Sequence, residues 1–217
     1  MLMLTELQHD VISETLNIGM GHAASALNEL VAEEVGLAVP RVSIVTREEA
    51  VEMLRDRASD QVSGVSQDFS AEFEQSDAVN GQAFLLFPRS DSLRVVNMLL
   101  GDSVPLEALT EMEQEALSEI GNIIINATMS SFSDLLGQEI NTGLPVTQIG
   151  TCRSILHADD VDSDSDYILF SHVSFNLEQR AVNGYVVLLM DVQSMSALKA
   201  GINCYLERLN VPNSGTY

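Results

Sequence analysis

The chain has 217 residues, of which 46% are hydrophobic, and ten basic against 32 acidic side chains give a formal charge of -22. A chain of this length and composition can bury a core and should be globular. Nucleic acid and anionic membranes are excluded as expected partners because both repel an acidic surface, and partners with basic surfaces are favoured.

The first predicted helix begins at a capping box, in which the side chains of Thr5 and Gln8 each accept a hydrogen bond from the backbone N–H of the other residue. Gly19 and Gly21 interrupt the helical pattern. A kink or break is expected there, separating an exposed front segment from a buried rear one. The apolar stripe expected to face the core comprises Leu7, Val11, Ile18, Ala26, Leu27 and Leu30.

Beyond Pro40 the first half alternates short strands and helices. Apolar periodicity predicts a strand at 42–45, a helix at 47–55, strands at 65–73 and 82–87, and a helix at 91–100. The two later strands are close in sequence and are expected to pair antiparallel. The residues Ala78, Val79, Asn80 and Gly81 are expected to supply the turn between them.

The second half repeats the first. At an offset of 105 residues, 11 of the 37 positions from Leu4 to Pro40 are identical to those from Leu109 to Pro145. At an offset of 103, the residues Ala78 to Gly81 recur as Ala181 to Gly184. The same patterns predict a second capping box at Thr110 and Glu113, strands at 166–175 and 185–190, and a helix at 192–209.

This repeat organises the whole chain into two copies, at about 4–101 and 109–209. We expect one domain over 1–217. Its class should be α+β, with a pseudo-twofold internal repeat and a mostly antiparallel central sheet on which long helices pack.

A polar face recurs on the long helix that opens each copy. Asp10, Glu14 and Asn17 lie within about 60° of one another at 100° per residue, and their counterparts are Glu115, Glu119 and Asn122. Such a face is also what an ordinary solvated helix displays. Recurrence in two divergent copies, where most other exposed positions differ, favours a functional site.

The side chains on this face restrict the chemistry. No His, Ser or Cys nucleophile is paired with them, and they resemble neither a hydrolytic triad nor a complete metal site. A neutral carboxamide can orient water for in-line attack on a phosphoryl group, a reaction that depends chiefly on positioning and charge neutralisation. A carboxylate one turn away can pair with a basic side chain of a partner.

At these residues the sequence resembles the CheC/CheX/FliY family of chemotaxis phosphatases. The family motif is Asp or Ser, three residues, Glu, two residues, Asn, twenty-two residues, Pro. Its spacing is met by Asp10, Glu14, Asn17 and Pro40, and by Glu115, Glu119, Asn122 and Pro145, where Glu115 replaces the usual Asp or Ser. Two intact motifs without an appended motor-switch domain are typical of CheC-type members.

The resemblance implies hydrolysis of the aspartyl phosphate of a phosphorylated CheY-like response regulator. Asn17 and Asn122 would position the water, Glu14 and Glu119 would pair with a receiver lysine, and Asp10 and Glu115 would support them. The chain would need no metal or cofactor of its own, because Mg²⁺ belongs to the receiver. A CheD-like deamidase is implied as a further partner.

The sequence leaves an alternative function open. The chain would then be a docking module that binds a receiver or a deamidase through the same helices without hydrolysis. An acidic run from Asp159 to Asp166 lacks the central glycine and terminal glutamate of a calcium loop, so a solvated loop is favoured over cation binding or partner steering. No sequence pattern distinguishes the activities of the two sites.

A chain without a basic leader or a long apolar run is expected to be cytoplasmic.

Overall fold

The computed structural model describes residues 4–30, 34–58, 60–72, 78–100, 111–158, 167–177 and 180–209. Within them, one antiparallel sheet carries long helices, which confirms the α+β class. The helices are α1 (Glu6–Leu30), α2 (Arg47–Ala58), α3 (Arg89–Leu100), α4 (Glu111–Leu136), α5 (Cys152–Ile155) and α6 (Val192–Arg208). The strands are β1 (Val35–Thr46), β2 (Gln61–Ala71), β3 (Val79–Pro88), β4 (Ile140–Thr142), β5 (Val146–Thr151), β6 (Tyr167–Leu177) and β7 (Arg180–Met190).

The sheet interleaves strands from the two copies of the repeat. Its order is β1-β6-β7-β3-β2, and both β4 and β5 pair with β2 at the far edge. The outer strand β1 of the first copy thus pairs with β6 of the second, while β4 and β5 of the second copy pair with β2 of the first. The strand order reads the same from either edge when repeat-equivalent strands are exchanged, as the pseudo-twofold repeat requires.

The centre of this symmetry lies between β3 and β7. In their antiparallel register, Phe84 is directly opposite Val187. These two residues are 103 positions apart, which is the offset of the repeat in this region. A residue paired with its own repeat equivalent marks the place where the pseudo-twofold axis crosses the sheet.

Val79 to Gly81 lie in β3 and Ala181 to Gly184 lie in β7, so the expectation that these segments form turns was wrong. Asn80 pairs with Ser70 in β2, and Asn183 pairs with Ser174 in β6. The Asn80 N–H donates to Ser194 Oγ at 2.9 Å, and the Asn183 N–H donates to Asp91 Oδ2 at 3.2 Å.

These two hydrogen bonds join the copies. Asp91 and Ser194 lie in the first turns of α3 and α6, and each accepts from a strand of the other copy. Since the two residues are also 103 positions apart, the recurring segment has the same hydrogen-bonding role in both copies.

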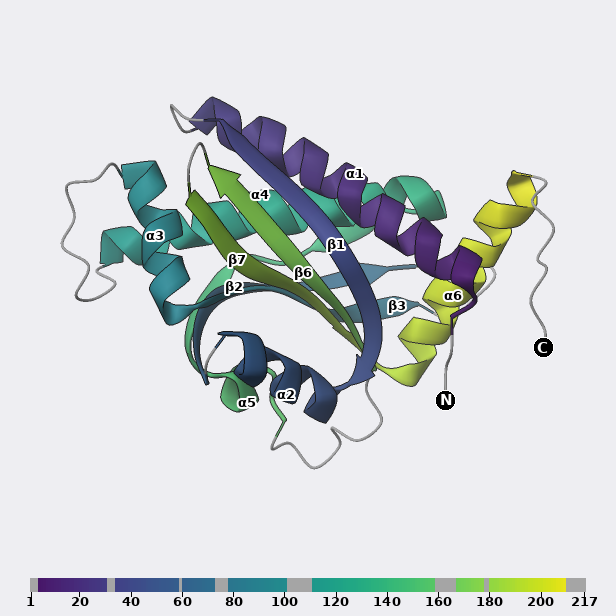
Figure 1. Ribbon diagram of the computed structural model, residues 1–217. Coiled ribbons are helices and arrows are strands. Elements are labelled where there is room, and N and C mark those ends of the chain that lie inside the picture. The colour runs from purple at the N-terminus through teal and green to yellow at the C-terminus, as the bar shows by residue number, and fades with distance from the viewer. Residues whose placement is uncertain are drawn as a thin grey trace.

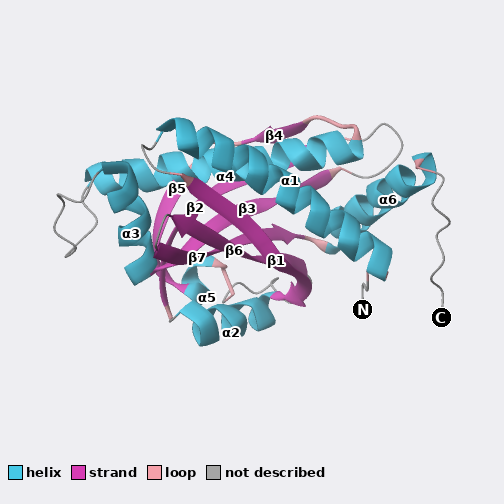
Figure 2. Ribbon diagram, turned by 45° about the horizontal axis from the view of Figure 1, so that its top comes forward, coloured by secondary structure: helices cyan, strands magenta, loops and turns pink. Residues whose placement is uncertain are grey.

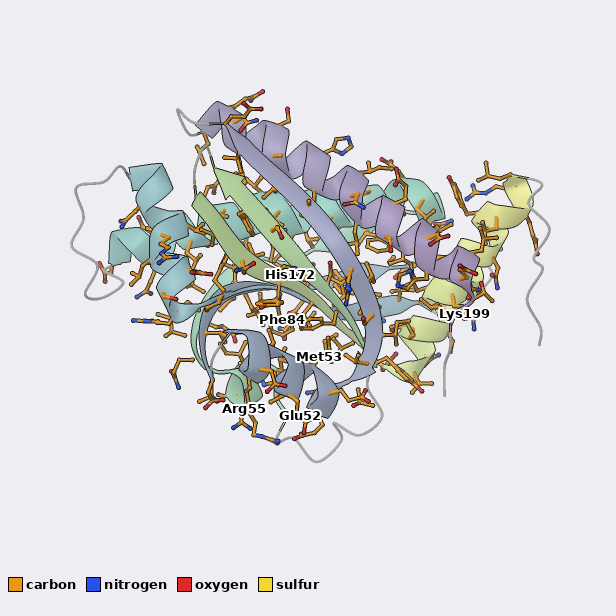
Figure 3. The ribbon with its side chains drawn as sticks, viewed as in Figure 1. Glu52, Met53, Arg55, Phe84, His172 and Lys199 are labelled. Carbon is orange, nitrogen blue, oxygen red and sulfur yellow. The ribbon has the colours of Figure 1, made fainter. Side chains whose placement is uncertain are left out.

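Helices cover both faces of the curled sheet. Figure 1 shows α1 and α4 lying along one face, and α2 with α5 held inside the curl on the other. Figure 2, turned by 45°, shows α1 and α4 side by side above the strands, with α3 and α6 at opposite ends. In Figure 3, Met53 of α2 and Phe84 of β3 lie in the concave side, where Phe84 belongs to a second, smaller apolar core.

Helix α1 begins at the expected capping box. Gln8 N donates to Thr5 Oγ1 at 3.2 Å, and Thr5 N donates to Gln8 Oε1 at 2.9 Å. The counterpart at Thr110 lies outside the described residues. No described helix combines the length and apolar character that crossing a membrane requires.

The break expected at Gly19 and Gly21 is wrong, because α1 is one continuous helix from Glu6 to Leu30. Gly19 is instead the point at which α1 crosses α4. A Cβ atom at Gly19 would lie 3.0 Å from Thr128 Cα, so glycine permits the close approach of the two helices. At Gly21 a Cβ atom would meet nothing within 4 Å.

The apolar stripe of α1 is rotated from the expected one. Ile18 and Leu30 are 47% and 49% exposed, and of the six expected residues Leu27 alone is fully buried. Four residues of the core face are polar or small, namely Gln8, Thr15, Gly19 and Ala23, and a count of large apolar residues overlooks them. The other buried residues of α1 are Ile12, Leu16, Met20 and Leu27. Contact of α1 with the sheet and with α4 buries this wider face, so the side of α1 that carries Glu14 and Asn17 faces solvent.

Candidate functional site

Each long helix presents its own polar group of three residues. Asp10, Glu14 and Asn17 of α1 are exposed, as are Glu115 and Glu119 of α4. Asn122, the last member of the second group, is half-buried. The first group is called the Asn17 site below and the second the Asn122 site.

The carboxamide of Asn17 is attached to the outer strand β1. Val39 N donates to Asn17 Oδ1 at 3.1 Å. A backbone N–H can only donate, so the oxygen of this carboxamide faces the strand and its NH₂ group faces away from it. The Asn17 site therefore has a defined amide orientation.

The strand is irregular at this point. The pairing register of β1 with β6 shifts between Ala38 and Arg41, and Pro40 within the irregularity has no N–H to give to a ladder. The Val39 N–H is thereby available to the helix. The 22-residue spacing between Asn17 and Pro40 is explained by this contact, since it brings the helix residue against the residue preceding the proline.

The carboxamide of Asn122 has different partners. Asn122 Oδ1 accepts from Gln67 Nε2 of β2 at 3.1 Å and from Asn126 Nδ2 of α4 at 2.7 Å. Asn126 Oδ1 in turn accepts from Thr142 Oγ1 at 2.8 Å. A network of side chains, and not a backbone amide, holds the second carboxamide.

The orientation of this network is anchored at a carbonyl. Gln67 Nε2 also donates to Gly143 O at 3.0 Å, and a backbone carbonyl can only accept. The NH₂ group of Gln67 must face Gly143 and Asn122, so the atom of Asn122 that meets it is its oxygen. Gln67 Oε1 consequently points into the protein, where it is buried without a hydrogen-bond partner.

Both helices are fastened to their outer strands at equivalent places. His9 Nε2 lies 2.8 Å from Val42 O, and Thr147 Oγ1 donates to Gln114 O at 3.3 Å. These pairs are related by the 105-residue offset. The strand segment before each attachment therefore flanks the polar face of its helix in the same way.

The two flanks differ in character. Beside the Asn17 site, Val39 is 6% exposed and Arg41 is an exposed cation. The equivalent residues beside the Asn122 site are Leu144, which is 86% exposed, and Val146, which is 54% exposed. One site is thus bordered by a positive charge and the other by an apolar surface.

Sequence reasoning missed Val39, Gln67 and Asn126. Asn126 had a usable signal, because it lies four residues after Asn122 on the same helix face. Gln67 had none, since it is 55 residues away and comes from a strand. Within the described part of the chain, no three His, Cys, Asp or Glu side chains gather as metal ligands. The acidic run at 159–166 lies outside the described residues.

Comparison with known proteins identifies related chains. No protein-family model matches the sequence. It is 24% identical over 157 residues to the CheY-P phosphatase CheC of Bacillus subtilis (strain 168), covering 70% of this chain and 71% of that protein. It is 23% identical over 177 residues to the flagellar motor switch phosphatase FliY of the same organism, covering 81% of this chain and 43% of that one.

The chain is similar in sequence to the CheC and FliY members of the CheC/CheX/FliY family. The fold is similar as well: the chain superposes on the crystal structure of Thermotoga maritima FliY with a TM-score of 0.70 at 20% identity, over 94% of this chain and all of that one. The FliG-FliM complex from H. pylori has the same fold, with a TM-score of 0.62 at 13% identity over 91% of this chain and all of that one. The expected resemblance is confirmed.

Proposed function

We propose that this CheC-type chain is a protein aspartyl-phosphate phosphatase that acts on a phosphorylated CheY-like response regulator. The observation that carries the proposal is the pair of Glu-x-x-Asn faces with exposed carboxylates, in each of which the chain itself holds the carboxamide oxygen and leaves the NH₂ group to a partner. The name of the Bacillus subtilis relative, a CheY-P phosphatase, supports the same substrate class.

The reaction needs positioning more than acid or base groups. The water oxygen attacks phosphorus, the bond between phosphorus and the aspartyl oxygen breaks, and inorganic phosphate and the free carboxylate are formed. Asn17 or Asn122 orients the water, and Mg²⁺ on the receiver neutralises the phosphoryl oxygens. The chain supplies no metal or cofactor in this scheme.

The carboxylates bind the partner. Glu14 and Glu119 each pair with a lysine of the receiver, and Asp10 and Glu115 lie one turn earlier on the same helix faces to support that contact. The charge of -22 favours this arrangement, because it steers toward the basic side of a partner and away from nucleic acid and anionic membranes. The proposal places the protein in the cytoplasm with its substrate, and a CheD-like deamidase is a further proposed partner.

The test is release of phosphate from a phosphorylated CheY-like receiver at sub-stoichiometric protein. Replacing both Asn17 and Asn122 with Ala should abolish turnover and leave receiver affinity within about threefold, because neither residue anchors the partner in this scheme. Glu14→Lys with Glu119→Lys should instead weaken affinity by reversing two charges. Undiminished turnover in the double Ala variant would contradict water positioning.

The second candidate is a docking module without hydrolysis. It is favoured by the likeness in fold to FliM, which is found in complex with FliG. A docking module would bind the receiver with the same sensitivity to Glu14→Lys and Glu119→Lys. It would not accelerate phosphate release at any protein concentration, which separates it from the enzyme.

A further inference from the structure

The acceptor capacity of the two carboxamides differs. A carbonyl oxygen has two lone pairs and accepts two hydrogen bonds well. At Asn122 both are in use, one by Gln67 Nε2 at 3.1 Å and one by Asn126 Nδ2 at 2.7 Å. Asn122 therefore offers a partner two N–H donors and no acceptor.

The arrangement at Asn122 is built into the fold. Gln67 is 2% exposed, and its orientation is set by Gly143 O, which accepts from the same NH₂ group. Asn126 turns its NH₂ group toward Asn122 because Asn122 Oδ1 can only accept, and the Thr142 hydroxyl, which can donate or accept, donates to Asn126 Oδ1. The buried Gln67 Oε1 has no hydrogen-bond partner, which costs free energy.

Asn17 retains an acceptor. Among the described residues, its oxygen has one hydrogen-bond donor, the Val39 N–H at 3.1 Å. The residue at the position of Asn126 is Gly21, which has no side chain to donate. Asn17 is also exposed, whereas Asn122 is half-buried. One lone pair and both N–H groups of Asn17 can face a ligand.

This difference bears on the proposed reaction. A water that attacks phosphorus through its oxygen is oriented best when one of its O–H groups donates to a fixed acceptor. Asn17 Oδ1 can accept that bond as it stands. Asn122 Oδ1 can accept that bond only after losing the hydrogen bond from Gln67 or from Asn126. The net free energy of such a hydrogen bond is about 0.5–1.5 kcal/mol, which corresponds to a factor of roughly two to ten in rate.

We propose that the two sites are unequal, and that Gln67 and Asn126 are positioning residues that restrain Asn122 by occupying its acceptor. The Asn17 site is the principal hydrolytic site, and the Asn122 site is slower because it is held by its own network. This inference rests on the proposed phosphatase function and adds to it the residues that set the activity of each site.

The first experiment releases the restraint. In an Asn17→Ala background, where the Asn122 site acts alone, Asn126→Ala and Gln67→Met each remove one donor to Asn122 Oδ1. Each should raise kcat for phosphate release about two- to tenfold with KM unchanged, because the docking carboxylate Glu119 is untouched. A change that merely loosened the structure would lower kcat or raise KM.

The second experiment imposes the restraint on the other site. In an Asn122→Ala background, Gly21→Asn places an amide four residues after Asn17, as Asn126 stands to Asn122. It should lower kcat about two- to tenfold. Gly21→Ala is the matched control, since it adds a Cβ atom in open space without a donor and should leave kcat unchanged.

The outcomes separate this inference from the proposed function. If the unmutated protein releases no phosphate from the receiver, the phosphatase proposal fails first. If it does release phosphate, equal or lower kcat in both Asn126→Ala and Gln67→Met overturns the restraint at Asn122. Equal kcat in Gly21→Asn and Gly21→Ala overturns it as well, because the same donor would then have no effect at the exposed site.

Discussion

At the scale of single residues, the motif asparagines have their orientation decided by groups that can act in one way alone. Val39 N–H can only donate, and Gly143 O can only accept, so the oxygens of Asn17 and Asn122 both face the protein. The motif itself does not contain this information. Identical residue types at identical spacing thus acquire different hydrogen-bonding capacity from their neighbours.

The reactivity of the two cysteines also depends on the groups around them. Burial raises the pKa of the Cys152 thiol to about 11, and the nearby negative charge of Asp60 adds to the rise. Cys204 is exposed. The described part of the chain thus has one buried, unreactive thiol and one accessible thiol.

A thiol-reagent titration tests this difference. At pH 8 a thiol with a pKa of about 11 is ionised to roughly one part in a thousand, so Cys152 should not react in the folded protein. We expect one fast-reacting thiol per chain in the native state and two after denaturation. Cys204→Ser should remove the fast reaction, and a fast reaction that persists in this variant would contradict the buried state of Cys152.

At the scale of elements, two helix glycines illustrate what packing adds to propensity. Gly121 of α4 lies against β2, where a Cβ atom would be 2.4 Å from Val65 Cβ. Gly21 of α1 faces open space. Glycine at either position lowers the helix propensity to a similar extent. A difference in stability between substitutions at the two positions therefore reports the contact between α4 and β2.

Substitution with alanine should therefore have opposite effects at the two glycines. Gly21→Ala should raise the free energy of unfolding by about 0.5–1 kcal/mol through reduced chain entropy. Gly121→Ala should lower it by about 1–2 kcal/mol, because overpacking against Val65 outweighs the same gain. Urea unfolding measures both, and equal changes would show that α4 can move away from β2 at little cost.

At the scale of the whole molecule, the copies are interleaved and strongly charged. Every pairing of an outer strand crosses from one copy to the other, and the bonds from Asn80 and Asn183 cross as well. Ion pairs such as Arg55 with Asp60 lie at the surface and are worth little. The charge of -22 is therefore mainly a source of repulsion within the fold.

Screening should relieve this repulsion. Raising NaCl from about 0.02 M to 0.3 M shortens the Debye length from roughly 20 Å to 6 Å, so acidic groups on neighbouring helices repel one another less. We expect Tm to rise by several degrees in a calorimetric scan. A Tm that falls would mean that the surface ion pairs stabilise the fold more than the excess acid destabilises it.

The sequence alone determined the repeat, the fold class and the residues of the motif. Most elements of the sheet and the helices that follow Pro40 were predicted, since apolar periodicity is a local property. The stripe of α1 and the turn at Asn80 were wrong. Burial of Thr15 and Gly19 depends on α4, and the position of Asn80 within β3 depends on its pairing with β2.

Tertiary structure alone decided how the two sites differ. The donor to Asn17 comes from 22 residues away, and one donor to Asn122 from 55 residues away on another strand. Such contacts depend on strand register and helix packing, which no local pattern encodes. A duplicated motif was therefore readable in the sequence, whereas the acceptor left free at Asn17 and occupied at Asn122 became visible only in the folded chain.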